Sequence, residues 1–378
     1  MFDLRNRHRA EAAGGRPPWS PGAGGRPRSW SALPATVLRV IHARRLESRV
    51  GVAAGVLLIL FLAFSVPALR SPASVGASSR QAVHARAAVS AQRSLPQPAH
   101  PATPTPATPA GVFATDWLAT HPSPDLGIQG QGVILVDVDK HEVRWQRDAS
   151  TLRAPASLTK IVTAMVAVDL VPLDHPVTVG PNTDMKAVQK VEPASTLMGL
   201  SPGEVLTVHE LLYGLFLRSG NDAAETLGSG IVPRDQFVAL MNQKAAELGM
   251  KNSHFTTPVG LDDPAMRTTP YDLAIAAAAV VSRYPELLAI SGTPQITIPQ
   301  TPTHKAFAME NYNKLLLPGP WAYPGATGMK TAFTDDAGPC MVATAARGNR
   351  RLVAVILHSD NFFGDATKLL NYGFGLPS

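Results

Sequence analysis

A run of twenty residues without a charge, VGVAAGVLLILFLAFSVPAL at positions 50–69, divides this chain of 378 residues. At about 1.5 Å per residue, a helix of that length spans the roughly 30 Å hydrocarbon core of a bilayer. Arg39, Arg44, Arg45 and Arg49 lie just before the run, and positive charge marks the cytoplasmic end of a membrane span. We therefore expect a single-pass signal anchor in the cell membrane, with the N-terminus in the cytoplasm and the rest of the chain outside.

A cleaved signal peptide is the alternative explanation for this run. Its charged region would be unusually long, and its apolar stretch would exceed the usual 7–15 residues. The size of the membrane-free protein after mild alkaline extraction separates the two cases. We favour the uncleaved anchor.

Residues 1–49 form an arginine-rich arm, which we expect to be cytoplasmic and largely disordered. The arm holds ten Arg, no Lys and three acidic residues, whereas the rest of the chain holds 24 basic and 25 acidic residues. The basic balance therefore belongs to the arm and not to a folded domain. Since a nucleic-acid-binding domain needs basic residues clustered on its folded part, we expect no nucleic-acid partner.

Residues 70–112 contain no acidic and no aromatic residue and include the segment PQPAHPATPTPATP. Such a segment cannot bury enough apolar area to offset its ordering entropy, and its prolines favour extended polyproline II. We expect an extracytoplasmic linker that reaches at most about 130 Å from the bilayer. The folded domain is then expected at residues 113–378.

Strand patterns occur at both ends of that domain. GVILVDVD at 132–139 and VRWQR at 143–147 predict a strand pair, and the continuous apolar run RLVAVILHS at 351–359 predicts a central strand. Because the sheet is assembled from distant segments, we expect an α+β fold in which an antiparallel sheet is flanked by helices and carries an inserted helical region.

Helix signals fill the middle of the domain. Thr207 and Glu210 form a T-x-x-E capping box for a helix that continues through Phe216. Thr269, followed by a proline and by Asp272, starts the alanine-rich helix YDLAIAAAAVV.

The stretch APASLTKIVTAMVAV at 154–168 predicts a helix that is apolar on most sides. Ser157 lies in its first turn and Lys160 lies three residues on, so the two side chains share one face. They could be a helix cap and a solvated charge, or a nucleophile and its base. Burial would lower the pKa of Lys160 towards a value useful in a base, but S-x-x-K alone does not decide between these interpretations.

No metal or organic cofactor is expected. The single cysteine, Cys340, excludes a disulfide within the chain and a cysteine-rich metal site. His209, His254, His304 and His358 lack the spacing of metal ligands, and no serine lies in a G-x-S-x-G motif.

Two further motifs follow S-x-x-K in order. Ser219 and Asn221 form S-x-N in LRSGNDAAE, and Lys330 and Thr331 form K-T in TGMKTAFTDDAG. The ordered set resembles the signature of serine penicillin-binding proteins and their β-lactamase relatives. The similarity includes APASLTK, STLMGLSPGEVLTVHELLYGLFLRSGNDAAE, LGMKNSHFTTPVGLDD, TTPYDLA and RRLVAVILHS, and it is to the D-alanyl-D-alanine carboxypeptidases, which have the penicillin-binding protein fold.

The resemblance implies a role for each motif residue. Ser157 would be the acyl-accepting nucleophile and Lys160 its general base. Ser219 would relay a proton to the leaving D-alanine, and Asn221 would hold the substrate backbone. The expected substrates are peptidoglycan stem peptides, and β-lactam antibiotics are expected to be covalent inhibitors.

Substrate-binding roles fall on the third motif. Lys330 would attract the terminal carboxylate and help to keep Lys160 neutral, and Thr331 would hydrogen-bond that carboxylate. The backbone N–H groups of Ser157 and Phe333 would form the oxyanion hole.

The third motif departs from the family pattern K-T-G at Ala332. A methyl group there could narrow the space for substrate, so we expect retained activity with altered efficiency, and a faster acylation by labelled penicillin in Ala332→Gly.

Three alternatives stay open. One is an endopeptidase that cuts cross-links with the same residues. Another is a pseudoenzyme, disabled at Ala332, that only binds peptidoglycan or penicillin. A β-lactamase is the third, although no E-x-x-x-N segment lies between Asn221 and Lys330 to activate the deacylating water, so slow release of penicillin is expected.

Overall fold

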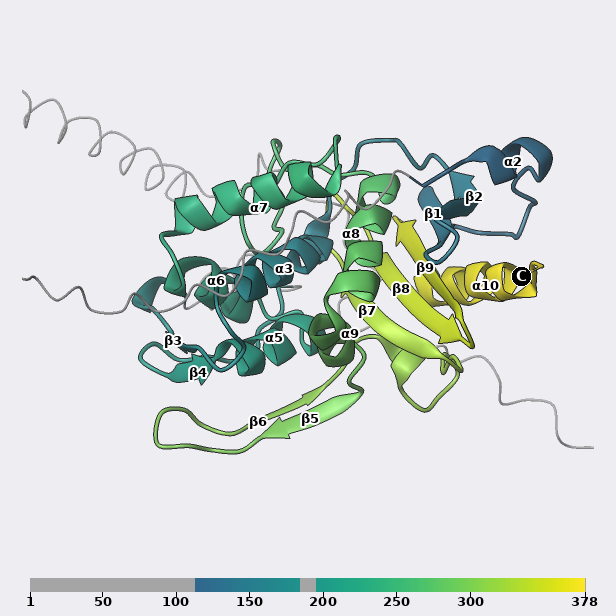
Figure 1. Cartoon of the computed structure of the whole chain (residues 1–378). Helices are drawn as coiled ribbons and strands as arrows, with labels where there is room; N and C mark the ends of the chain where they lie inside the picture. Colours follow the sequence, from purple (N-terminus) through teal and green to yellow (C-terminus); the bar gives the residue numbers. More distant parts are fainter. Residues whose placement is uncertain (1–112, 184–194, 378) are drawn as a thin grey trace, which may run out of the picture. The chain divides into compact units, whose positions relative to one another are not determined.

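The computed structural model describes residues 113–183 and 195–377, which belong to one compact unit, Pro104–Ser378. The expected cytoplasmic arm, membrane anchor and linker at residues 1–112 lie outside the described residues. The described ranges form a main sheet, helices on both of its faces and an inserted helical region (Figure 1).

Five strands form a fully antiparallel sheet in the order β2-β1-β9-β8-β7. The first and last segments of the domain meet in its middle, where Gly132 pairs with Leu357 and Asp137 with Leu352. Every residue of β1 is buried, as a strand covered on both faces requires. The strand pair and the central strand expected from the sequence are confirmed. The five strands are β1 (Gly132–Asp137), β2 (Glu142–Arg147), β7 (Ala326–Ala332), β8 (Cys340–Arg347) and β9 (Arg350–Leu357).

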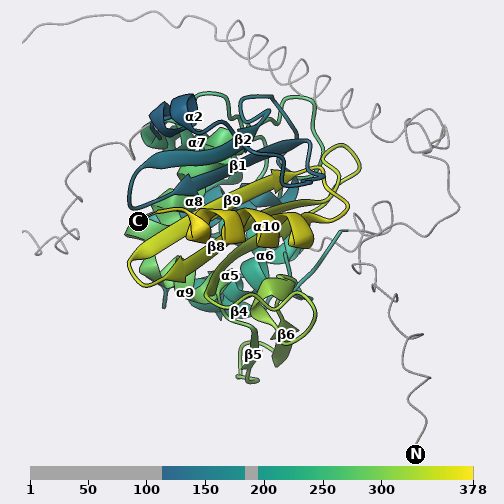
Figure 2. The same ribbon diagram turned by 90° about the vertical axis from the view of Figure 1, so that its right-hand side faces the viewer.

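Helices cover both faces of this sheet. α8 (Pro270–Arg283) packs on one face, and α10 (Phe362–Gly375) packs on the other (Figures 1 and 2). The predicted start of α8 is confirmed, since the Thr269 hydroxyl accepts a hydrogen bond of 3.0 Å from the N–H of Asp272. The alanines of α8 are buried, and their small side chains let the helix lie close to the sheet.

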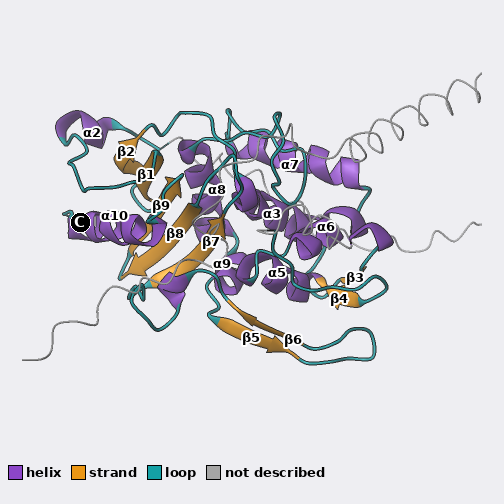
Figure 3. Ribbon diagram, turned by 180° about the vertical axis from the view of Figure 1, so that it is seen from behind, coloured by secondary structure: helices purple, strands orange, loops and turns teal. Residues whose placement is uncertain are grey.

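A helical region is inserted between β2 and β7 and lies to one side of the sheet (Figure 3). The predicted capping box is present at the start of α5, where the N–H of Glu210 donates to the Thr207 hydroxyl at 3.2 Å and the Glu210 carboxylate accepts from the N–H of Thr207 at 2.8 Å. The α+β fold with an inserted helical region is therefore confirmed. The helices of this region are α3 (Lys160–Leu170), α5 (Val208–Leu217), α6 (Asn221–Gly230), α7 (Arg234–Leu248) and α9 (Pro285–Ser291).

Smaller elements complete the domain. Two strand ribbons, β3 with β4 and β5 with β6, stand apart from the main sheet (Figure 3). The elements are α2 (Asp116–Thr120), η2 (Ala156–Thr159), β3 (Pro176–Thr178), η3 (Pro181–Thr183), β4 (Val205–Thr207), β5 (Gln295–Ile298), β6 (Phe307–Glu310) and η4 (Lys314–Leu316).

No helix among residues 113–183 and 195–377 is by itself long and apolar enough to cross a bilayer. By length and composition alone, the pair α8 and α9 meets the requirement together, with a bend of 108° between them.

Candidate active site

Ser157 lies in a 3-10 turn and not, as the sequence suggested, in the first turn of an α-helix. The 3-10 turn covers Ala156–Thr159, and α3 begins only at Lys160. Ala156 has a φ of +48°, which an α-helix does not tolerate, so no α-helix can extend back through this residue. In a 3-10 turn the side chains of residues i and i+3 eclipse each other. This turn therefore stacks Ser157 and Lys160 more directly than an α-helix would.

Lys160 is completely buried and makes three polar contacts. Its Nζ lies 2.9 Å from the Ser157 Oγ, 2.7 Å from the Asn221 Oδ1 and 2.7 Å from the carbonyl oxygen of Val259. Ser157 itself is only partly buried. The serine hydroxyl is therefore open to a substrate while the amine behind it is dry.

The contacts of Lys160 fit an uncharged amine. Asn221 and Val259 each offer an oxygen that can only accept, so together they use both N–H groups of a neutral amine. The lone pair is then left for the Ser157 hydroxyl, which can donate. Burial lowers the pKa of Lys160 well below its usual value, the positive charge of Lys330 lowers it further, and Asp222 opposes the shift.

Ser219 and Asn221 are presented by the turn between α5 and α6. Ser219 is buried and has a φ of +55°, and Asn221 is the first residue of α6. The Asn221 Nδ2 donates to the Ser195 Oγ at 2.6 Å, so the amide is fixed from one side by Ser195 and from the other by Lys160. No described residue hydrogen-bonds the Ser219 hydroxyl, which leaves it able to bind a ligand.

Asp222 fastens the segment at 198–200 to the start of α6. Its carboxylate accepts backbone hydrogen bonds of 2.8 Å from Met198, Gly199 and Leu200. The Thr196 hydroxyl donates to the carbonyl oxygen of Ser219 at 2.8 Å. The residues at 196–200 therefore help to hold the S-x-N turn in place.

Lys330 and Thr331 lie on β7, which packs against the turn that carries Ser157. Both are buried, and the Lys330 Nζ donates to the carbonyl oxygen of Thr331 at 2.5 Å. Burial lowers the pKa of Lys330 to about 7. Phe333 directly follows β7 and is partly buried, so the two backbone N–H groups expected to form the oxyanion hole belong to segments in contact.

Val259 and Gly260 are site residues that sequence reasoning missed. A Cβ on Gly260 would lie 2.0 Å from the carbonyl oxygen of Ala156, and its φ is +85°. Only glycine therefore lets this segment approach closely enough for Val259 to bind Lys160. The one available signal was a glycine in the stretch PVGLDD, which by itself assigns no contact.

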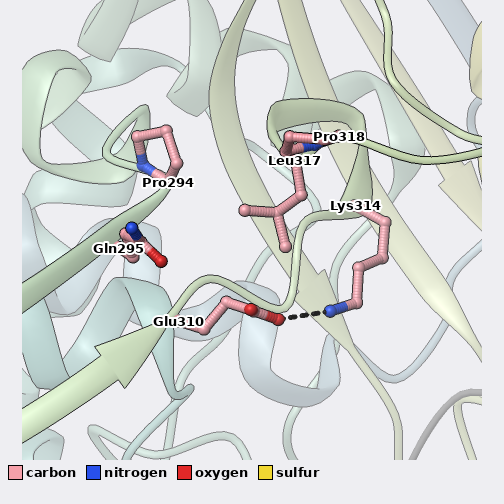
Figure 4. Close-up of a pocket in the computed structure, with 6 residues that line it drawn as sticks. All are labelled: Pro294, Gln295, Glu310, Lys314, Leu317 and Pro318. Carbon is pink, nitrogen blue, oxygen red and sulfur yellow. Dashed lines mark hydrogen bonds and ion pairs between the residues drawn. The ribbon is translucent and has the colours of Figure 1, made fainter.

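The described part of the chain contains no group of three or more His, Cys, Asp or Glu side chains that could hold a metal ion. One pocket, of about 680 Å³, lies beside the β5–β6 ribbon (Figure 4). Its walls are mostly apolar, and its charged side chains, Glu310 and Lys314, pair with each other at 2.7 Å. None of the site residues lines it, so this pocket lies apart from the candidate active site.

Comparison with known proteins gives one family. The model of the D-alanyl-D-alanine carboxypeptidases, peptidase family S11, matches residues 118–361. The chain is 32% identical over 258 residues to the D-alanyl-D-alanine carboxypeptidase DacF of Bacillus subtilis, a match that covers 66% of this chain and 63% of the relative. It is 34% identical over 251 residues to DacB2 of Mycobacterium tuberculosis, covering 64% of this chain and 81% of the relative.

Solved structures show the same similarity. A D-alanyl-D-alanine carboxypeptidase from Mycobacterium tuberculosis superposes with a TM-score of 0.59 at 34% identity, covering 68% of this chain and 94% of that one. The DD-transpeptidase of Streptomyces K15 superposes with a TM-score of 0.60 at 31% identity, covering 67% and 99%. The fold is thus that of penicillin-binding DD-peptidases.

Proposed function

This chain belongs to the D-alanyl-D-alanine carboxypeptidase family, and on that basis we propose that it removes the terminal D-alanine from peptidoglycan stem peptides through an acyl-enzyme on Ser157. The observation that carries the proposal is the contact of 2.9 Å between the Ser157 Oγ and a fully buried Lys160 Nζ. A dry amine with a lowered pKa is able to act as a general base at neutral pH.

In the acylation step, neutral Lys160 takes the proton of Ser157 as the Oγ attacks the carbonyl carbon of the penultimate D-alanine. The negative charge that develops on the carbonyl oxygen is held by the N–H groups of Ser157 and Phe333. The C–N bond then breaks, and the leaving nitrogen receives a proton through Ser219. Water hydrolyses the resulting ester, and Ser157 regains its proton.

Lys330 and Thr331 are proposed to bind the terminal carboxylate of the peptide. Lys330 has a pKa of about 7 in the free protein, and a bound carboxylate raises the pKa of a nearby amine. Substrate would thus charge Lys330, and that charge would in turn keep Lys160 neutral for the attack.

We also propose that the enzyme acts at the outer face of the cell membrane. The proposal rests on the uncharged run at 50–69 and the arginines before it. It would place the domain at 113–378 on a proline-rich linker, within reach of peptidoglycan.

Mass spectrometry of the full-length chain after treatment with penicillin tests the acyl-enzyme. We expect one adduct, on the peptide that contains Ser157, and release of D-alanine from a pentapeptide. Both should disappear in Ser157→Ala and persist in Ser282→Ala, a matched control because Ser282 is exposed on α8. An adduct elsewhere, or D-alanine release by Ser157→Ala, would contradict the mechanism.

The same experiment addresses the other candidates. A pseudoenzyme would form the adduct yet release no D-alanine. A β-lactamase would turn penicillin over rapidly. Among the described residues, the hydrogen-bond partners of the Lys160 amine are Ser157, Asn221 and Val259, none of them a carboxylate, and we expect a long-lived adduct. Cross-linked dimer peptides and amine acceptors, added separately, distinguish an endopeptidase and the transpeptidation of the Streptomyces relative from simple trimming.

A further inference from the structure

Arg218, the residue before Ser219, is a partly buried cation with an unusual environment. It is the one described arginine whose side chain makes neither a hydrogen bond nor an ion pair with any described residue. Its guanidinium carbon lies 4.8 Å from the centroid of the Tyr312 ring. Stacking of this kind covers one face of the guanidinium and leaves its in-plane N–H groups available.

Arg218 directly precedes Ser219, the residue proposed to pass a proton to the leaving group. Arg218 caps the C-terminus of α5, and this helix runs from the β3–β4 ribbon towards β7 (Figure 3). The N–H of Tyr312 donates to the carbonyl oxygen of Leu217 at 3.0 Å. The following turn, η4, packs against β7, the strand of Lys330.

Arg218 and Tyr312 therefore belong to two segments that contact each other, one leading into the S-x-N turn and the other into the turn that packs on the strand of the third motif. A partly buried guanidinium without an acidic partner carries a desolvation cost that a bound anion removes. A planar carboxylate matches the fork of an arginine and forms two parallel hydrogen bonds with it.

We infer that Arg218, stacked on Tyr312, is a specificity-determining residue that binds the C-terminal carboxylate of the leaving D-alanine together with Lys330 and Thr331. The inference rests on the proposed function. Arg218 touches no reacting atom in this assignment. Its contribution is to select substrates that end in a free carboxylate.

The test pairs one change in the protein with one change in the substrate. The full-length chain and Arg218→Gln are assayed on a peptide that ends in D-Ala-D-Ala and on its C-terminal amide. On the free acid we expect kcat/KM of Arg218→Gln to fall about 10- to 100-fold, mostly through KM. On the amide the variant and the parent should differ by less than about twofold, because the carboxylate is already absent.

Acylation by a penicillin and by its methyl ester gives a second measurement that does not depend on turnover of the amide. We expect Arg218→Gln to slow acylation by the penicillin and to leave acylation by its methyl ester nearly unchanged. Arg347→Gln is the matched control, since Arg347 also stacks on aromatic rings, those of Tyr323 and Phe374, but at the opposite end of β8 from the site.

Equal losses of Arg218→Gln on acid and amide, or no loss on either, would overturn the assignment. Equal losses would mean that Arg218 only shapes the S-x-N turn, and thermal unfolding of the variant would then show a lowered Tm. If the parent chain releases D-alanine from neither peptide and forms no adduct, the proposed function fails. That result is distinct from a failure of the carboxylate subsite alone.

Discussion

Gly260 decides how closely the carbonyl of Val259 approaches Lys160. In Gly260→Ala the new methyl would meet the backbone oxygen of Ala156 at 2.0 Å, and a backbone atom cannot move aside as a side chain can. We expect a loss of roughly 3 kcal/mol or more in the free energy of unfolding and slower acylation by labelled penicillin. Urea unfolding and a gel-based acylation assay measure the two effects.

Gly249→Ala is the matched control for this change. Gly249 has a φ of +84°, against +85° for Gly260, and a Cβ there would meet nothing within 4 Å. It should cost only the backbone strain, about 1 kcal/mol, with normal acylation. If both variants lose the same stability and acylate normally, close packing at Gly260 is not what positions Lys160.

Because its pKa is lowered in the folded domain, Lys330 makes the free energy of unfolding rise with pH. A lysine paired with a carboxylate, whose pKa is raised, would make it fall. Its pKa in the folded domain is about 7 and its ordinary value is 10.5. Below pH 7 both states carry the proton, and the folded state bears the full cost of a buried charge. Between pH 7 and 10.5 only the unfolded chain holds the proton, so this cost falls by about 1.4 kcal/mol for each pH unit.

We therefore expect Lys330→Met to abolish D-alanine release and yet to raise Tm at pH 7. Its advantage over the parent should shrink steadily as the pH rises to 10. Thermal unfolding of both proteins across this pH range measures the gap, and Lys251→Met, at an exposed lysine, should follow the parent curve. A gap that stays constant with pH would mean that Lys330 is not buried as a neutral amine.

At the level of elements, α6 acts as the anchor of the S-x-N turn through Asp222. This carboxylate accepts four backbone hydrogen bonds, of 2.8 to 2.9 Å, from Ala223 and from the segment 198–200. An asparagine keeps one acceptor oxygen and turns an NH₂ group towards donors. In Asp222→Asn we expect unfolding to become easier by about 3 kcal/mol.

The same variant should change the pH profile of acylation. The charge of Asp222 raises the pKa of Lys160, so its removal lowers that pKa and moves the acidic limb of kcat/KM to lower pH. Asp235→Asn is the control, because Asp235 holds the same second position of a helix, α7, but is exposed. An acidic limb that does not move would show that another group controls it.

Elements were predictable where their signals are local. The capping box of α5 and the Thr269 cap of α8 depend on residues three apart, and both were correctly placed. The central position of β9 followed from its continuous apolar run. The 3-10 turn at Ser157 was not foreseen, because the φ of Ala156 goes with close packing against Gly260, more than a hundred residues away.

The site itself was only half visible in the sequence. Three ordered motifs marked Ser157, Lys160 and the residues of the two other segments. The carbonyl of Val259 and the hydroxyl of Ser195 were not marked, because a backbone acceptor leaves no residue preference and a serine in a loop is common. Arg218 was not marked either, because Tyr312, the ring on which it stacks, is its neighbour only in three dimensions.

At the scale of the whole molecule, the site forms where the inserted helical region meets the sheet. The turn of Ser157 contacts β7, and the strands β1 and β9 close the domain from its two ends. The site therefore requires the complete domain. None of the described contacts of the site involves a residue that precedes the domain. We expect a chain starting at Pro104, the first residue of the compact unit, to fold alone and to keep the parent kcat/KM within about twofold.

The membrane proposal belongs to the same scale and is tested on the same pair of proteins. After an alkaline wash, the membrane fraction should retain the full-length chain at its intact mass of 40.0 kDa, while the chain from Pro104 stays soluble.

Leu58→Arg places a charge at the centre of the uncharged run, at a cost of about 3 kcal/mol for insertion, and should release a large share of the protein. Val83→Arg, in the linker, should release none. Retention of the shorter chain, or equal behaviour of the two arginine variants, would contradict an anchor at 50–69, and a shortened membrane-free product would instead indicate a cleaved signal peptide.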